Sequence, residues 1–345
     1  MNKPSMERCE MIYISKEDVL AGYLEERGLL KTESSYKIHY CRGGVSCTVA
    51  YVEIDGRPMI IKQALEQLKT KDTWLCDPNR MYIEYESNKI YHDLLPENAP
   101  ETYFYDQENY IYGREAVPDG CLMWKDDLMK GIIDYKVAEK AADTLAAVHN
   151  HCAGNEEIAR LFENKDVFYA LRISPYINFT VTKHPEIAEF AQKVSDEMME
   201  SRITLIHGDY SPKNIMVTED GMKVLDYEVA NYGHPAFDLA FLSNHFILKA
   251  VKFPERSGKY LDLLDYTVKR YFHALTCMDR QEFEHSFIRT LALLMLARVD
   301  GKSPVEYLTE EKEKQELVRR LSLTMIKSNT DTYNETINML RQQLR

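Results

Sequence analysis

The apolar residues of this chain change from a mainly strand-like to a mainly helical spacing near Pro118, and that change constrains the fold more than any other feature of the sequence. From Tyr36 to Lys62, and again from Tyr103 to Tyr112, apolar residues largely alternate with smaller or polar ones, and Asp55-Gly56 is a dipeptide typical of two-residue hairpin turns. Beyond Pro118 the spacing is mainly that of amphipathic helices. A strand-rich segment followed by a helix-rich one predicts an α+β fold.

The same pattern suggests three parts. Residues 1–35 are expected to form an N-terminal extension with one short helix that ends at Gly28. Residues 36–116 are expected to form a small lobe, with a sheet of about five antiparallel strands and one helix that starts after Asp77-Pro78. Residues 117–345 form a larger, mainly helical lobe in which three short strand-like pieces surround the motif described below.

Composition excludes several classes of function. The 345 residues contain 55 acidic and 43 basic side chains, and a net charge of −12 disfavours binding to nucleic-acid phosphates. No apolar run approaches the ~20 residues of a membrane-spanning helix, and no apolar run follows the charged N-terminus as it would in a secretory signal. Seven scattered cysteines without a Cys-x-x-Cys pair suggest free thiols. The one close histidine pair, His149 and His151, is two positions apart, unlike zinc ligands three or four apart, so no structural zinc is expected. We expect a cytoplasmic protein without a nucleic-acid or membrane partner.

One motif contains the strongest candidates for catalytic and metal-binding residues in this sequence. The segment His207-Gly-Asp-Tyr-Ser-Pro-Lys-Asn214 lies between two strand-like pieces, and Asp226-Tyr-Glu228 lies at the end of the next piece. A hairpin there would bring Asp209, Asn214 and Asp226 together, and their oxygens suit Mg²⁺. Asp209 and Asn214 alone would also suit an ordinary polar turn, so the second acidic cluster is what favours a site. Phosphoryl transfer needs these parts, because it depends on positioning, metal charge and an oriented hydroxyl.

A lysine and a glutamate in the first lobe could add to this site. Lys62 ends a strand, where a lysine can also simply lie at a sheet edge. On the helix that follows, Glu86 lies three residues after Ile83 and four before Ile90, so its carboxylate should face the packed side. We expect Glu86 to pair with Lys62, with Glu84 as the second choice.

His-Gly-Asp-x-x-x-x-Asn followed by Asp-x-Glu resembles the aminoglycoside phosphotransferase and choline kinase family, small-molecule kinases with a protein-kinase-like fold. This resemblance implies two lobes: a small antiparallel-sheet N-lobe with one helix, which binds nucleotide and ends in a hinge, and a larger, mainly helical C-lobe with the catalytic loop and substrate site. It covers roughly residues 36 to 310 and includes Gly43-Gly-Val-Ser46, Ile61-Lys62, Trp124-Lys-Asp-Asp127, Ala147-Val-His149 and Pro235-Ala-Phe-Asp-Leu-Ala240.

The resemblance also implies residue roles. Asp209 would be the catalytic carboxylate, Asn214 and Asp226 the Mg²⁺ ligands, and Glu228 a further metal or substrate contact. Lys62 would hold the α- and β-phosphates of ATP or GTP. Further nucleotide contacts are expected in a weak glycine-rich loop, which could also be a bulged hairpin, and in the connector after the last strand: Gly43, Gly44 and Ser46 in the loop, and Arg114, Glu115 and Ala116 in the connector.

The function predicted is a Mg²⁺-dependent phosphotransferase that acts on a hydroxyl of a small molecule, like an aminoglycoside, choline or sugar kinase. A protein kinase is one alternative, but only 11 residues separate Asp226 from Asp238, too few for a long activation segment, and no Ala-Pro-Glu is present. A non-catalytic nucleotide-binding scaffold is another, and it is disfavoured because Lys62, Asp209 and both metal-ligand candidates are all retained.

Some polar residues near these motifs also have structural explanations. His207 could be a buried imidazole bonded to the backbone, and Asp238 is expected to hold the backbone of the catalytic loop from a helix start. Five residues of the helical lobe could line a substrate pocket or could equally be caps, ion pairs or packing: Trp124, Asp126, Asp127, Arg172 and Tyr176.

Overall fold

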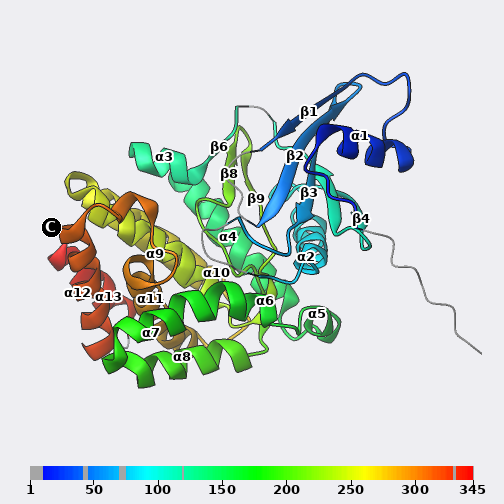
Figure 1. Cartoon of the computed structure of the whole chain (residues 1–345). Helices are drawn as coiled ribbons and strands as arrows, with labels where there is room; N and C mark the ends of the chain where they lie inside the picture. The colour runs from blue at the N-terminus through cyan, green and yellow to red at the C-terminus, as the bar shows by residue number, and fades with distance from the viewer. Residues whose placement is uncertain (1–10, 42–45, 70–74, 119, 329–331, 345) are drawn as a thin grey trace, which may run out of the picture. The chain divides into compact units, whose positions relative to one another are not determined.

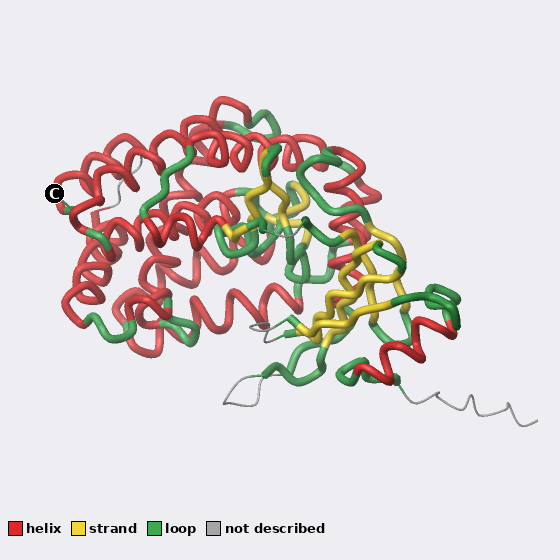
Figure 2. Tube along the Cα trace, turned by 90° about the horizontal axis from the view of Figure 1, so that it is seen from above, coloured by secondary structure: helices red, strands yellow, loops and turns green. Residues whose placement is uncertain are grey.

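The computed structural model describes residues 11–41, 46–69, 75–118, 120–328 and 332–344. The chain divides into two compact units, Met1–Glu86 with Glu101–Ala116, and Ser87–Pro100 with Val117–Arg345. Figure 1 traces the chain through both, and Figure 2 shows that strands dominate one unit and helices the other. The α+β architecture expected from the sequence is confirmed.

The first unit is built on a five-stranded antiparallel sheet, as predicted, in the order β1-β2-β3-β5-β4. Asp55 and Gly56 connect its longest hairpin with φ angles of 50° and 76°, the positive values that a type I′ turn requires. The strands are β1 (Tyr36–Tyr40), β2 (Cys47–Ile54), β3 (Arg57–Ala64), β4 (Thr102–Asp106) and β5 (Ile111–Glu115).

Helix α1 (Glu17–Glu26) packs against this sheet. Its apolar face, with Leu20 and Leu24, shares a core with Ile38 of β1 and Val52 of β2. The Tyr23 hydroxyl also donates a hydrogen bond to Asp106 Oδ2 at 3.0 Å. The segment predicted as an N-terminal extension therefore completes the core of the sheet.

Helix α2 (Arg80–Leu94) carries the chain from the first unit into the second. Its buried face contains Arg80, Glu84, Asn88 and Tyr91, which repeat at the helical spacing of three to four residues. Most of this face is polar, so a search for apolar periodicity does not find it.

The second unit is mainly helical. Helix α9 is buried along nearly its whole length and packs against α10, α11 and α12. The α-helices are α3 (Trp124–Lys130), α4 (Tyr135–Cys152), α5 (Glu156–Leu161), α6 (Asp166–Phe168), α7 (Phe179–Lys183), α8 (Ala188–Glu200), α9 (Ala236–Lys252), α10 (Ser257–Ala274), α11 (Arg280–Asp300), α12 (Lys312–Ser328) and α13 (Tyr333–Gln343). The others are a π-helix, η1 (Tyr169–Asn178), and three 3₁₀ turns, η2 (Pro185–Ile187), η3 (Pro254–Arg256) and η4 (Glu306–Leu308).

Two small sheets lie within this helical unit. One has the order β6-β8-β9, and the other pairs β7 with β10 in antiparallel fashion. Their strands are β6 (Leu122–Met123), β7 (Thr204–Ile206), β8 (Ile215–Thr218), β9 (Gly221–Val224) and β10 (Asn231–Gly233). The loop between β7 and β8 and the loop between β9 and β10 carry the predicted site residues of this unit.

Hydropathy along the helices also bears on membrane insertion. Within the described parts of the chain, no helix combines the length and the apolar character needed to span a bilayer.

Candidate active site

The loop between β7 and β8 is held in place by Asp238, in the first turn of α9. Asp238 Oδ2 accepts the backbone N–H of His207 at 2.6 Å, and Oδ1 accepts that of Gly208 at 2.8 Å. Gly208 has a φ of 72°, and a Cβ there would lie 2.6 Å from the carbonyl oxygen of Val229, so this position requires glycine. The prediction that Asp238 bonds the loop backbone is confirmed.

His207 ties this loop to the one after β9. Its buried Nδ1 accepts the backbone N–H of Asp209 at 3.2 Å, so Nε2 carries the proton and donates it to the carbonyl oxygen of Leu225 at 3.2 Å. Burial lowers the pKa of His207, which keeps the ring neutral. A structural imidazole bonded to the backbone therefore accounts for His207.

Asp209 lies among groups that fix its position and its charge. Arg172 NH2 is 3.0 Å from its Oδ1, and Lys213 Nζ is 2.8 Å from its Oδ2, which also accepts Asn214 Nδ2 at 2.8 Å. Burial raises the pKa of Asp209, but the charges of Arg172 and Lys213 outweigh it, so the pKa lies below its usual value. Asp209 is therefore an ionised carboxylate at neutral pH although it is buried.

Arg172 reaches this loop from the π-helix η1, which has Pro175 inside it. Its Nε donates a hydrogen bond to the Gly208 carbonyl oxygen at 2.6 Å, and its guanidinium lies 5.4 Å from the centre of the Phe241 ring. Isolated π-helical turns are often found at functional sites. The sequence suggested Arg172 only as one possible pocket residue, because no local spacing connects it to Asp209.

The other four residues weighed as pocket lining differ in their surroundings. Tyr176 follows Arg172 by one turn, and its ring lies 5.8 Å from the Arg172 guanidinium. Trp124 is core packing, since it is buried edge-on against Phe246. Asp126 and Asp127 lie in the first turn of α3.

Asn214 and Asp226 are brought next to Asp209 by the β8-β9 hairpin. The Leu225 backbone N–H donates to the Asn214 carbonyl oxygen at 2.8 Å, so Asp226 follows directly. The charge of Asp226 acts on the pKa of Asp209, as expected of close carboxylates. The predicted proximity of these three residues is confirmed.

Two features of Asn214 and Asp226 are typical of a functional site. Asn214 Nδ2 donates to both Asp209 Oδ2 and the Asp209 carbonyl oxygen, which leaves Asn214 Oδ1 as the side-chain atom available to a metal. Asp226 has a φ of 71°, a conformation uncommon for residues other than glycine and frequent at functional sites.

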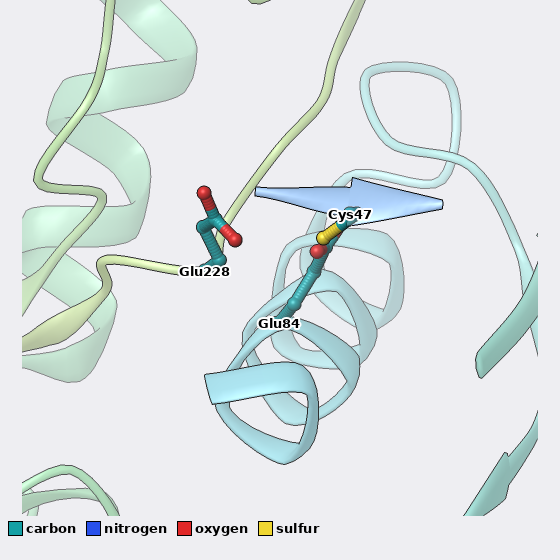
Figure 3. Close-up of side chains that lie close together, drawn as sticks. All are labelled: Cys47, Glu84 and Glu228. Carbon is teal, nitrogen blue, oxygen red and sulfur yellow. The ribbon is translucent and has the colours of Figure 1, made fainter. Parts of the chain in front are cut away.

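Glu228 is the remaining acidic candidate of the second unit. It is buried on the segment after β9, where Figure 3 labels it. Burial lowers the pKa of Arg172, but acidic neighbours, led by Asp209 and including Glu228, raise it above its usual value. Glu228 therefore lies within electrostatic reach of the Arg172–Asp209 pair.

In the first unit, Lys62 pairs with Glu84 and not with Glu86. Lys62 Nζ lies 2.6 Å and 2.8 Å from the two Glu84 carboxylate oxygens, and both side chains are buried. The prediction of Glu86 as the partner is wrong because Ile83 and Ile90, which flank it in helical spacing, lie on a half-buried face. Glu86 lies beside Tyr82, whose pKa is raised by burial and by the Glu86 charge. Figure 3 shows Glu84 on α2 and Cys47 on β2.

A buried arginine that the sequence analysis missed supports the start of β2. Arg80 NH2 donates to the carbonyl oxygens of Ser46 at 2.6 Å and Leu65 at 2.7 Å, and NH1 donates to that of Cys76 at 3.1 Å. Arg80 thereby fixes the backbone that follows the expected glycine-rich loop. Of that loop, Ser46 is described, whereas Gly43 and Gly44 lie outside the described residues.

The expected connector is largely a continuation of the sheet. Arg114 and Glu115 are the last residues of β5 and pair with Ile60 and Met59 of β3. The Glu115 backbone N–H also donates to the Glu101 carbonyl oxygen at 2.8 Å. Ala116 is the first residue beyond the strand and is buried. Nucleotide contact by Arg114, Glu115 and Ala116 stays a prediction.

Part of this chain is similar in sequence to known kinases. Two methylthioribose kinases of Oryza sativa subsp. japonica are 26% and 27% identical over 219 residues, 55% of this chain and 51% of theirs, so the chain spans about half their length. A methylthioribose kinase of Escherichia coli O45:K1 is 26% identical over 269 residues, 67% of this chain and 63% of its own.

Two solved structures share the fold. A choline kinase from Cryptosporidium parvum Iowa II has a TM-score of 0.56 at 13% identity and covers 95% of this chain and 99% of its own. A choline/ethanolamine kinase family protein from Mesorhizobium loti has a TM-score of 0.54 at 13% identity, with 89% and 92% covered. Residues 99–256 match the family described as the phosphotransferase enzyme family. This matching segment contains Asp209, Asn214 and Asp226.

Proposed function

We propose that this protein is a small-molecule kinase that transfers the γ-phosphoryl group of ATP or GTP to a hydroxyl group of a metabolite. The observation that carries the proposal is the buried, ionised Asp209 carboxylate, held by Arg172, Lys213 and Asn214. A carboxylate fixed in this way can orient a hydroxyl group for in-line attack, which is the main requirement of phosphoryl transfer.

The low pKa of Asp209 defines its part in the reaction. A weakly basic carboxylate is a poor proton acceptor before the hydroxyl attacks, so its first contribution is to accept a hydrogen bond and orient the hydroxyl oxygen. Lys213 Nζ, 2.8 Å from Asp209, places a positive charge where the transferred group would be negative. Arg172 holds the loop backbone through its hydrogen bond to the Gly208 carbonyl oxygen, and so fixes the position of the Asp209 carboxylate.

The donor set next to Asp209 fits Mg²⁺. Asn214 Oδ1, the Asp226 carboxylate and the Glu228 carboxylate are hard oxygen donors on two adjoining loops. Mg²⁺ bound there would neutralise the phosphate charge of the nucleotide. In the first unit, Lys62 is the proposed contact for the α- and β-phosphates, and its ammonium group pairs with the Glu84 carboxylate.

The short segment after Asp226 supports a metabolite rather than a protein as the acceptor. Strand β10 begins at Asn231 and helix α9 at Ala236, so no long segment is present there to dock a peptide. The relatives are methylthioribose kinases, which makes a pentose-type sugar one candidate acceptor. The choice between ATP and GTP, and the cytoplasmic location, stay predictions.

An acceptor screen tests the proposal. The purified full chain is incubated with ATP or GTP, with and without Mg²⁺, and with methylthioribose, choline, ethanolamine, an aminoglycoside or a casein-type protein. Formation of phosphorylated metabolite is the expected result, and Asp209→Asn should lose about 10² to 10⁴ of the rate while nucleotide binding is retained. Turnover by Asp209→Asn within about threefold of wild type would contradict the assignment of Asp209. Labelling of protein at a comparable rate would support the protein kinase alternative, and no transfer to any acceptor would support the scaffold.

A further inference from the structure

A small cavity of about 30 Å³ lies in the second unit next to the catalytic loop. It adjoins the site because Lys213, which lies in its wall, is also the residue paired with Asp209. Helices α9 and α11, the 3₁₀ turn η4 and the start of α3 supply the other charged or hydrogen-bonding residues of the wall: His245, Arg298, Glu306, Tyr307 and Lys125.

Three buried atoms of this wall have no hydrogen-bond partner among the described residues. They are His245 Nε2, Arg298 Nε and the Tyr307 hydroxyl. His245 is only 6% exposed and Arg298 8%. Buried polar atoms are nearly always paired in native proteins, because an unpaired one loses its hydration without compensation. Arg298 Nε can only donate, and His245 Nε2 and the Tyr307 hydroxyl can donate or accept, so the three together suit a ligand that accepts hydrogen bonds.

The charges around the cavity indicate the sign of that ligand. Glu306 pairs with Lys125, and Lys213 pairs with Asp209, which leaves Arg298 without a carboxylate partner among the described residues. Lys249 is fully buried, its Nζ lies 5.4 Å from the centre of the Tyr307 ring, and no described carboxylate lies within ion-pair distance of it. The Arg298 guanidinium is therefore a positive charge that no described carboxylate balances, so an anion is stabilised here and a cation such as an ammonium group is repelled.

We propose that this cavity binds a small anionic group of the phosphate acceptor, such as a carboxylate. The inference rests on the proposed function and narrows its substrate class to hydroxy acids and sugar acids. A single water needs about 10 to 15 Å³ of such space, so only a terminal group of that scale enters the cavity. The hydroxyl-bearing part of the acceptor then lies on the side of Asp209.

Matched pairs of acceptors test this without changing the protein. Glycerate is compared with glycerol, ribonate with ribose, and gluconate with glucose, each with saturating ATP and Mg²⁺. Because a hydrogen bond to a charged group is worth more than one to a neutral group, the acid should be favoured by about tenfold or more in kcat/KM. Calorimetric titration of each acid and each neutral partner measures binding independently of transfer.

Variants connect the preference to the cavity. Arg298→Met removes a charge and a donor, and should lower the acid-to-neutral ratio of kcat/KM by about tenfold. Because Arg298 also donates to Ser303 and Tyr176, this variant needs a folding check, and Tyr307→Phe provides a milder test with an expected loss of about threefold. Arg289→Met, on the same helix but paired with Glu197 outside the cavity, should leave the ratio unchanged.

The outcomes separate this inference from the proposed function. Turnover of neutral acceptors with no preference for acids would overturn the anionic cavity and leave the kinase assignment intact. Binding of an acid that is weakened by Tyr307→Phe, with no transfer to any acceptor, would support the cavity and contradict the kinase assignment. If none of the three acids binds or reacts better than its neutral partner, the cavity proposal is wrong.

Discussion

The Arg172 guanidinium lies 3.0 Å from Oδ1 of Asp209, and its Nε donates a hydrogen bond to the carbonyl oxygen of Gly208 at 2.6 Å. Both side chains are buried. One residue of a π-helix therefore fixes the backbone of the loop between β7 and β8 and also favours the ionised form of its carboxylate.

Arg172→Met should raise the pKa of Asp209 and reduce turnover. The loss of a buried cation favours the protonated carboxyl, so the acid limb of the pH–rate profile should move to higher pH. In the wild type, the lowered pKa of Asp209 adds stability above its usual pKa, and this stability is lost as pH falls through the lowered value. Breaking a buried pair costs about 3 to 5 kcal/mol, so thermal unfolding is measured alongside. Arg289→Met is the control, and an unmoved acid limb in Arg172→Met would contradict the role of Arg172.

Glu84→Gln should weaken nucleotide binding, and Glu86→Gln should not. Lys62 is held only 2.6 Å from Glu84, so a neutral glutamine leaves a buried ammonium group without its counter-charge. We expect a loss of about ten- to a hundredfold in ATP affinity for Glu84→Gln, measured by calorimetry on samples shown to be folded. The two variants make the same chemical change on the same helix, two residues apart. Equal effects of both would show that the ion pair does not position Lys62 for nucleotide.

Asp226→Asn should remove the Mg²⁺ dependence of nucleotide binding. Asparagine tolerates the φ of 71° at this position better than alanine does, so the substitution tests charge with little added strain. Titration of ATP with and without Mg²⁺ should show a large metal effect in wild type and a much smaller one in the variant. An unchanged metal effect would place Mg²⁺ on other ligands.

The features that depend on local sequence pattern could be predicted from the sequence alone. Alternation and the Asp55-Gly56 turn predicted the antiparallel sheet, and the spacing of Asp209, Asn214 and Asp226 predicted a shared site, because a short hairpin joins them. The glycine-rich loop at Gly43 and Gly44 lies outside the described residues, so its part in the site stays a prediction.

Interactions between segments distant in sequence were harder to predict. Helix α2 buries a face that is largely polar, so Ile83 and Ile90 indicated the wrong side and Glu86 the wrong partner. The π-helix η1 has no propensity signal of its own, and the contact of Arg172 with Asp209 arises only from tertiary packing.

Lys249→Met should stabilise the protein at neutral pH, by an amount that shrinks as pH rises. Burial, with a smaller contribution from nearby Lys125, lowers the pKa of Lys249 from 10.5 to about 7. The unfolded state therefore binds more protons than the folded state between about pH 7 and pH 10, and this lysine makes wild-type stability increase with pH across that window. This lowering of the Lys249 pKa corresponds to about 3 to 5 kcal/mol of folding free energy. Methionine is the replacement because it has a similar length without the charge.

The measurement is the urea midpoint of both proteins at about pH 6 and about pH 9, with Lys252→Met as the control on the same helix. Lys252 is paired with Glu311 and partly exposed, so its loss should change stability by about 1 kcal/mol or less and in the destabilising direction. The advantage of Lys249→Met over wild type should be largest at the lower pH, where the buried amine must carry its proton. A difference that is the same at both pH values would mean that Lys249 titrates normally and that its charge is balanced in the folded protein.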